Sequence, residues 1–260
     1  MKQDFTRNKY RQLLVILQTG GYSFITFADY CKGEKEGRFV ILRHDVDLRP
    51  DFSLATAKIE HELGIRSVYY FRAVPESWDE TIIKEIASMG HEVGYHYESL
   101  TTCSGNVEAA YDDFKKHLKE LRCLTAVETI CMHGSPRSPY DSKDIWKSYD
   151  YKSLNILGEP YLSTDFSKML YLTDTGRRWD GYKASVRDKI EGFQEEWNEK
   201  GWSFHSTDDI IEALQENRLP DCLMITTHPQ RWSDFGVSWL KELILQNIKN
   251  VVKRVIVTFK

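Results

Sequence analysis

Residues 39–64 read FVILRHDVDLRPDFSLATAKIEHELG, and this stretch predicts the unit from which the chain is built. The run Phe39–Arg43 is short, apolar and β-branched, which is typical of a buried strand. In Asp51–Leu63 the apolar residues recur at helical spacing, and Gly64 follows as a residue suited to end a helix. The stretch therefore predicts a strand, a short polar loop and a helix in that order.

The same alternation continues to the end of the chain and predicts βα units around a mostly parallel sheet or barrel. Residues 1–37 are expected to be a mainly helical N-terminal extension packed on the barrel, within a single domain of residues 1–260. The expected strands are Phe39–Arg43, Ser67–Phe71, Glu92–His96, Glu128–Met132, Met169–Thr173 and Cys222–Thr227. The expected helices are Arg7–Gln18, Asp51–Leu63, Asp79–Met89, Asn106–Leu121, Thr207–Gln215 and Val237–Val252.

Composition excludes several classes of protein. The 260 residues include 35 Lys and Arg against 39 Asp and Glu, and a net charge of −4 argues against nucleic acid as a partner. Five cysteines without close pairs argue against a disulfide scaffold or a cysteine zinc site. The sequence has no signal peptide and no run of eighteen apolar residues, so we expect a cytoplasmic protein without a membrane span.

Histidines and carboxylates gather where the expected strands end. In a parallel sheet the carboxyl ends of the strands share one edge, where ligands bind and chemistry occurs. In extended backbone, residues i and i+2 point to the same side, so Asp45 and Asp47 should face one space. The full set comprises His44, His96, His133 and His228 with the carboxylates Asp45, Asp47 and Glu98.

Aspartate and histidine ligands without thiolates suit zinc or another divalent transition metal that keeps an open position for water. Such a site predicts metal-assisted hydrolysis. A structural alternative is that each strand-end histidine only binds neighbouring backbone. Likewise, Asp45 and Asp47 could cap a helix or pair with Arg43 or Arg49.

A polar, glycine-containing loop follows the strand Met169–Thr173. In it, Arg177 and Arg178 could grip a carboxylate or a diphosphate, and Trp179 could stack on a sugar. The alternative is a surface loop with one ion pair to Asp174 or Asp180. Tyr97, beside His96, is a further possible sugar platform.

Three motifs resemble the polysaccharide deacetylases of the NodB-homology type, also called carbohydrate esterase family four: HDVD at 44–47, GHEVGYH at 90–96 and LMITTHP at 223–229. The resemblance spans residues 38–227. It is closest to a subgroup tied to surface-polysaccharide (O-antigen or capsule) biosynthesis, through HYESL, MHGSP and TDTGRRWDG. It implies a distorted (β/α)7 barrel and metal-dependent removal of an acetyl group from a sugar.

The resemblance also implies roles for single residues. Asp45 matches the family's general base, Asp47 and His96 match two metal ligands, and His228 matches the general acid. The family's second metal-binding histidine would fall at position 100, where this chain has Leu100. His133 is the preferred replacement because it is an imidazole on the same face. Glu98 is the second candidate, and loss of tight metal binding is the third possibility.

The leading hypothesis is thus a hydrolase of carbon–nitrogen bonds that carries one divalent metal, Zn²⁺ by preference, and removes an N-acetyl group. Its expected substrate is an acetylated sugar or a nucleotide- or lipid-linked glycan precursor. One alternative is a catalytically degenerate domain that binds carbohydrate or a partner on the same barrel. Another is a different metal-dependent C–N hydrolase, because a fold does not fix the substrate.

Overall fold

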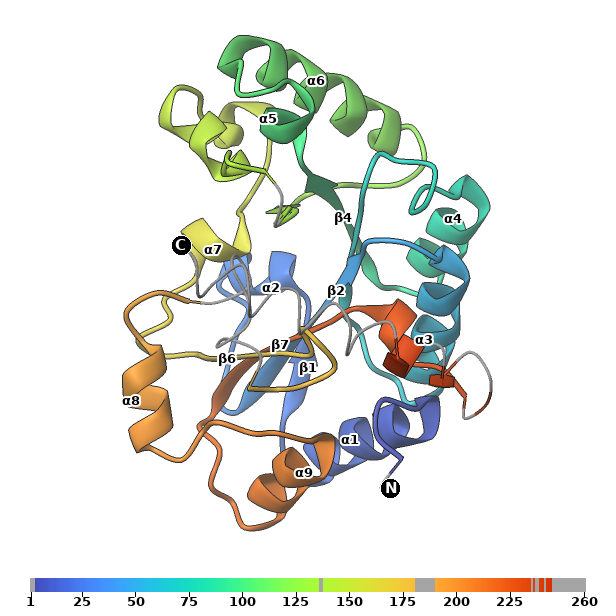
Figure 1. Cartoon of the computed structure of the whole chain (residues 1–260), viewed down its shortest axis with the longest axis vertical. Coiled ribbons are helices and arrows are strands. Elements are labelled where there is room, and N and C mark those ends of the chain that lie inside the picture. Colours follow the sequence, from blue (N-terminus) through green and yellow to red (C-terminus); the bar gives the residue numbers. More distant parts are fainter. Residues whose placement is uncertain are drawn as a thin grey trace.

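The computed structural model describes residues 3–135, 138–180, 190–234, 236, 239–240 and 242–244. Six of its strands confirm the six expected from the sequence, with ends shifted by up to three residues (Figure 1). A further strand, β1, lies within the expected N-terminal extension and was not predicted, because three residues are too few to show a periodicity. The strands are β1 (Ser23–Ile25), β2 (Phe39–Val46), β3 (Val68–Phe71), β4 (Glu92–Tyr97), β5 (Ile130–Met132), β6 (Leu170–Thr173) and β7 (Cys222–Thr227).

All seven strands pair in parallel in one sheet of order β5-β4-β3-β2-β7-β6, with β1 also paired to β2. Strand β2 lies in the middle of the sheet, and β1 and β3 pair with different parts of the same side of it. Residues 39–41 pair with β1, and residues 43–46 pair with β3. In the described part of the chain β5 and β6 form the two outer edges, so the sheet is a half-barrel. This confirms the expected α/β class and the distorted (β/α)7 barrel.

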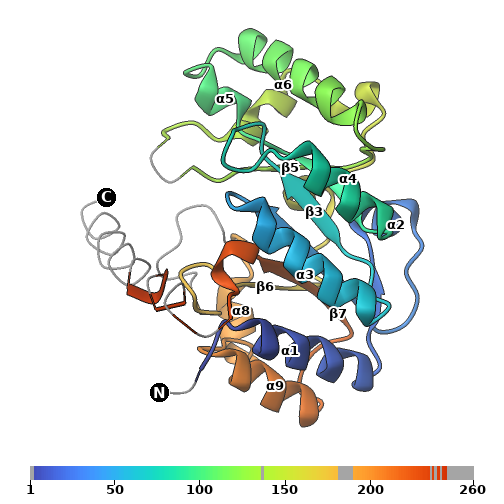
Figure 2. The same ribbon diagram turned by 90° about the vertical axis from the view of Figure 1, so that its right-hand side faces the viewer.

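Helices cover the outside of the half-barrel. Figure 2 shows α6, α4, α3, α1 and α9 in a row from top to bottom. Five expected helices are confirmed, whereas the expected helix 237–252 lies mostly outside the described residues. The longer helices are α1 (Arg7–Thr19), α3 (Pro50–Glu62), α4 (Glu80–Ser88), α6 (Val107–Arg122) and α9 (Thr207–Gln215). Shorter ones are α2 (Phe27–Lys32), α5 (Ser99–Thr102), α7 (Pro160–Ser163) and α8 (Gln194–Glu199), with 3₁₀ turns η1 (Ser142–Lys147), η2 (Tyr151–Leu154) and η4 (Pro229–Arg231).

Local sequence explains where these helices begin. Pro50 stands at the first position of α3, where its missing N–H leaves no donor unsatisfied. Ser206 and Asp209 form a reciprocal capping box at the start of α9.

Among the described residues, no helix is both long and apolar enough to cross a lipid bilayer. The five cysteines form no disulfide.

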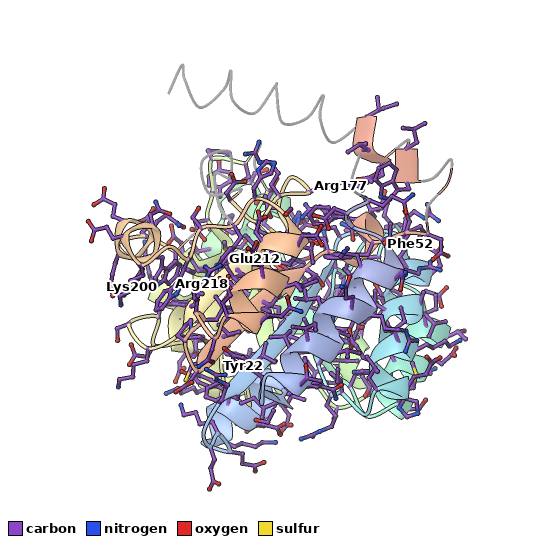
Figure 3. The ribbon with its side chains drawn as sticks, turned by 90° about the horizontal axis from the view of Figure 1, so that it is seen from below. Tyr22, Phe52, Arg177, Lys200, Glu212 and Arg218 are labelled. Atoms are coloured by element: carbon purple, nitrogen blue, oxygen red, sulfur yellow. The ribbon has the colours of Figure 1, made fainter. Side chains whose placement is uncertain are left out.

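Every residue of β2 is buried, as expected for a parallel strand covered on both faces. Because all strands run the same way, the loops that follow β2, β4, β5, β6 and β7 lie at one end of the molecule. Figure 3 shows Phe52 and Arg177, which follow β2 and β6, toward that end, and Tyr22, which precedes β1, toward the other. The strand-end residues named above therefore gather at one end of the molecule, with the exception of the side chain of His44, which faces the other side of the sheet.

Glu60 of α3 anchors a fully buried polar network behind the sheet. Its Oε1 lies 2.8 Å from His44 Nε2, and it also accepts a hydrogen bond from the Tyr10 hydroxyl. Its Oε2 accepts from Tyr69 at 2.9 Å and from Ser67 at 2.5 Å. Burial alone would raise the pKa of Glu60, but His44 and the other partners outweigh it and lower the pKa to about 2. Glu60 is thus a charged group whose partners all come from the protein.

This network makes stability sensitive to acid. A carboxyl whose pKa falls from 4.5 to about 2 on folding stabilises the protein above pH 4.5, and this contribution is lost as the pH falls toward 2. We expect Glu60→Gln to lower the free energy of unfolding at pH 7 by about 3–5 kcal/mol in urea titrations, because it breaks a buried charge network. Glu62→Gln, on the exposed side of the same helix, should cost less than about 1 kcal/mol. Equal effects of the two changes would contradict this role for Glu60.

Candidate metal centre

Four residues that follow or end strands converge at the carboxyl edge of the sheet. Asp47 Oδ1 lies 3.7 Å from His96 Nε2 and 3.5 Å from His133 Nε2, and Asp47 Oδ2 lies 3.8 Å from His228 Nε2. Asp47 follows β2, His96 belongs to β4, and His133 and His228 come directly after β5 and β7. Residues from four strands therefore meet around one carboxylate.

The three imidazoles are oriented by their other ring nitrogen. His96 Nδ1 donates to the Cys131 carbonyl at 3.0 Å, His133 Nδ1 to Glu98 Oε2 at 2.8 Å, and His228 Nδ1 to Asp174 Oδ1 at 2.7 Å. Each Nε2 is then directed to the space beside Asp47. In metal sites, the hydrogen bond at one ring nitrogen sets which nitrogen binds the ion.

The electrostatics of Asp47 fit a cation. Its Oδ1 is buried and has no hydrogen-bond partner, which is costly for a carboxylate oxygen. Burial alone would raise the pKa of Asp47, but His133, His228, His96 and Arg231 outweigh it and lower the pKa to about 2. An ionised oxygen without a donor, facing imidazole nitrogens, is a donor set that suits Zn²⁺ or a similar ion.

His96 is suited to be a neutral ligand. Burial lowers its pKa to about 4, so the imidazole is uncharged at neutral pH. Metal binding needs this neutral form, because the lone pair of Nε2 must be available.

Glu98, the alternative ligand, accepts a hydrogen bond from the His133 ring nitrogen that faces away from Asp47. Its Oε1 accepts two hydrogen bonds from Arg72, at 3.1 and 2.6 Å, and its Oε2 accepts the one from His133. Arg72 also donates to the Asp47 carbonyl at 3.0 Å. Burial alone would raise the pKa of Glu98, but His133 and Arg72 outweigh it and lower the pKa to about 2. The contacts favour His133 as the ligand and Glu98 as the carboxylate that orients it.

Leu100 stands where the resemblance would place a second metal-binding histidine. It lies in α5, is 4% exposed and belongs to the apolar core around Phe114. The side chain at this position therefore packs in the apolar core. His133, directly after the neighbouring strand β5, is an imidazole that the structure places beside Asp47.

Asp45 is paired with Arg43, as the structural alternative expected. Arg43 Nε donates to Asp45 Oδ1 at 2.8 Å and Nη2 to Oδ2 at 2.6 Å, and both side chains are buried. Asp45 Oδ2 also lies 3.8 Å from His96 Nε2, so the pair borders the cluster. The other arginine considered, Arg49, pairs with Asp51.

A cysteine that sequence reasoning did not assign to the site lies beside Asp45. One ligand atom each from Asp45, His96 and Cys131 lie within 4.8 Å of one another. Both Asp45 oxygens are engaged by Arg43, whereas Asp47 Oδ1 has no donor. The Asp47 side is therefore the better metal position.

Asp174, directly after β6, is the main site residue that sequence reasoning missed. Its carboxylate is fully buried and accepts from His228 Nδ1 at 2.7 Å, the His228 backbone N–H at 2.9 Å, Arg231 at 2.6 Å and the Trp232 indole at 2.8 Å. Burial and Arg231 would lower the pKa of His228, but Asp174 and Asp47 outweigh them and raise it. The signal was available in the sequence, since Asp174 is itself a strand-end carboxylate.

The expected sugar-binding residues are placed elsewhere. Arg178 pairs with Asp180 at 2.7 and 2.8 Å, which matches the surface-loop alternative. Trp179 is 4% exposed and donates to Thr207, and Tyr97 is fully buried, so neither presents a ring face to a sugar. Arg177 contacts the backbone of Asp4 and the side chain and carbonyl of Trp239. The described contacts do not bring these four side chains into the Asp47 cluster.

Structural neighbours of the chain are family 4 carbohydrate esterases. A CE4 family pseudoenzyme from Bacillus anthracis is 12% identical over 83% of this chain, with a TM-score of 0.45. PdaA of Bacillus subtilis, a family 4 carbohydrate esterase, is 10% identical over 92% of this chain and 83% of its own, with a TM-score of 0.39. The Xyl-CE4 domain of a multidomain xylanase from the hindgut metagenome of Trinervitermes trinervoides is 10% identical over 83% of this chain and 84% of its own, also with a TM-score of 0.39.

The chain spans 61% of the length of the Bacillus anthracis protein. A mutant of that protein with restored enzymatic activity is also similar, at 12% identity and a TM-score of 0.44 over 83% of this chain and 63% of its own. Neither a protein-family model nor a curated protein sequence matches the chain. The assignment of the fold is therefore based on the strand order of the sheet, and the assignment of the site is based on the contacts around Asp47.

Proposed function

We propose that this protein is a metal-dependent hydrolase that removes the N-acetyl group of an amino sugar. The observation that carries the proposal is Asp47 Oδ1, a buried oxygen without a donor that faces the Nε2 atoms of His96 and His133. The motifs HDVD and GHEVGYH, which contain Asp47 and His96, supply the link to sugar deacetylation.

Asp47, His96 and His133 would hold one divalent metal, with Zn²⁺ as the preferred ion for one carboxylate and two imidazoles. When bound, the metal would polarise the acetyl carbonyl and acidify a water molecule. Glu98 and Arg72 keep His133 and the backbone of Asp47 in place. A metal position built in this way is supported by a second layer of hydrogen bonds.

Asp45 is the proposed general base. Its two oxygens are held by Arg43, so the carboxylate has a fixed direction beside His96. A base acts best when its geometry is fixed before the substrate arrives. Asp45 accepts the proton of the attacking water as the water adds to the acetyl carbon.

His228 is the proposed general acid on the other side of Asp47. Its raised pKa favours the protonated form, and the bond from Nδ1 to Asp174 leaves the Nε2 proton directed to the site. His228 gives this proton to the departing amine as the carbon–nitrogen bond breaks. Asp174 stabilises the charged imidazole before the transfer, as a triad aspartate does.

The proposed substrate is an acetylated sugar of a glycan precursor for surface-polysaccharide biosynthesis, linked to a nucleotide or a lipid. The motifs HYESL, MHGSP and TDTGRRWDG support this finer assignment by resemblance alone. Purified protein can be assayed with N-acetylated chito-oligosaccharides, UDP-N-acetylglucosamine and lipid-linked N-acetyl sugars. Acetate release from none of them would contradict the proposed activity.

The metal is tested by its removal. We expect protein purified without chelators to hold about one equivalent of metal, to lose acetate release after treatment with dipicolinate, and to regain it with Zn²⁺. His133→Ala should hold under about a tenth of an equivalent, because one of three protein ligands is lost. Glu98→Gln should retain the metal with about 10–100-fold weaker affinity, because an orienting group and not a ligand is changed.

The matched control is His117→Ala, which removes a histidine of α6 that pairs with Asp113 and Glu120. It should leave metal content unchanged. Full metal content in His133→Ala with loss in Glu98→Gln would reverse the two roles. Activity that survives complete metal removal would overturn the metal-dependent mechanism.

A further inference from the structure

Arg177 is a buried cation that the proposed hydrolysis does not use. Its side chain is among the buried charged groups, with the residue only 7% exposed. Its Nη1 and Nη2 make long hydrogen bonds to the carbonyls of Trp239, at 3.3 Å, and Asp4, at 3.4 Å, and its Nε is buried without a partner. No carboxylate in the described ranges forms an ion pair with it. A buried guanidinium normally has such a partner.

The backbone at Arg177 is also unusual. Its φ of +55° lies in the left-handed region, which disfavours residues with a Cβ and costs on the order of 1 kcal/mol or more. Strain of this kind is found at ligand clamps and active sites. The loop after β6 thus holds a charged side chain in a position that neither an ion pair nor local backbone preference accounts for.

A cavity of about 220 Å³ lies against Arg177. This volume is below the usual range for drug-sized ligands, about 300–1,000 Å³, and so suits a single small residue. Its wall is partly apolar and aromatic, and its polar groups come from the start of α9, from Asp4 and from Arg177 itself. The lining includes Arg177, Phe5, Trp239, Asp4, His205 and Asp208.

The acidic groups of this cavity are already engaged. Asp4 Oδ1 accepts from the Phe5 N–H at 2.7 Å, and Oδ2 accepts from the Thr207 N–H at 2.9 Å. Asp208 pairs with Lys9 at 2.6 Å. Among the described residues, Glu242 and Asp4 are the carboxylates that act most on the charge of Arg177, but neither forms an ion pair with it, so a ligand carboxylate could balance that charge.

The position of the guanidinium selects the type of anion. Its carbon lies 5.5 Å from the centre of the Phe5 ring and 5.0 Å from that of Trp239, so both rings pack against the guanidinium. Nη1 and Nη2 each carry a second N–H besides the one that bonds to a carbonyl, and two such groups side by side match a carboxylate with two parallel hydrogen bonds. The first backbone donors of α9 are already used by Asp4 and Ser206, so the helix start offers little to a phosphate.

We propose that this cavity binds the carboxylate of an acidic sugar residue, with Arg177 as its specificity-determining contact. Packed side chains separate the cavity from the candidate catalytic site. The Phe5 ring is 5.0 Å from that of Trp232, whose indole donates to Asp174 beside His228.

The test is a binding measurement that does not depend on hydrolysis or metal. Metal-free protein is titrated with methyl β-D-glucuronoside and with methyl β-D-glucoside, which lacks the charge, by calorimetry and tryptophan fluorescence. We expect the acid to bind at least about tenfold more tightly, since a charge-assisted bidentate contact is worth that or more. Equal affinities in the wild type would overturn the proposal without any variant.

Variants assign the effect to Arg177. Arg177→Gln should weaken glucuronoside binding at least about tenfold and leave glucoside binding unchanged. The glucuronoside affinity of Arg177→Lys should lie between those of the wild type and Arg177→Gln, because lysine keeps the charge but lacks the planar guanidinium that donates two parallel hydrogen bonds. Arg178→Gln is the matched control, since that neighbouring guanidinium is already paired with Asp180. Thermal melting of each variant checks folding. An equal loss in Arg178→Gln, or displacement of the glucuronoside by inorganic phosphate at the same concentration, would overturn the assignment.

Discussion

Asp45→Asn should lower acetate release by at least about two powers of ten while the protein still holds close to one equivalent of metal. The amide can accept a hydrogen bond but cannot take up the proton of the attacking water. Metal content separates this loss from damage to the Asp47, His96 and His133 position, which the change does not touch. The measurements are steady-state acetate release and metal analysis on the same preparation.

The same change has a cost for folding. Arg43 would lose its charged partner inside the protein, which costs about 3–5 kcal/mol when a buried pair is broken. The assay therefore belongs well below the melting temperature of the variant. Asp51→Asn is the control, because Asp51 pairs with Arg49 at the exposed start of α3. If Asp45→Asn keeps wild-type activity, Asp45 is not the base.

Asp174→Asn should lower activity by about 10²- to 10⁴-fold, as expected when the group that orients and stabilises a catalytic histidine is lost. It should also change the pH profile. His228 must be protonated to act as an acid, so activity falls as the pH rises through its pKa. Asp174 helps to raise that pKa, so its removal should move the alkaline limb of the profile to lower pH.

This shift distinguishes a positioning role from a merely structural one. A loss of folded protein would lower activity at every pH without moving the limb. Asp180→Asn, on the same loop and paired with Arg178, should leave the profile unchanged. A profile for Asp174→Asn that keeps its wild-type alkaline limb would contradict the role of Asp174 in charging His228.

The strand pattern of the chain could be predicted because most of the six strands contain a short apolar or β-branched run followed by polar residues. The same pattern predicts one cluster of strand-end residues, because the carboxyl ends of parallel strands lie at the same end of the sheet. This cluster consists of Asp47, His96, His133 and His228. The alternation of side chains explains the exception: His44 precedes Asp45 by one residue, so it faces the opposite side and joins Glu60.

Other features depended on distant packing. Asp174 binds a histidine 54 positions away, so local spacing did not mark it as a partner of His228. Tyr97 was expected to flank a sugar because it neighbours His96, but neighbours in a strand face opposite sides, and Tyr97 lies in the core. Trp179 is buried against Phe5 and Trp232, aromatic residues near the two ends of the chain.

Arg43 and Asp45 stand two positions apart on one central strand, which has a consequence for how the protein can diversify. Asp45, the proposed proton acceptor, and Arg43, which holds it, both belong to β2. Rebuilding the surrounding loops would therefore not separate them. Variants with exchanged loops after β5 or β6 could change the sugar that is accepted and still inherit the same proton acceptor.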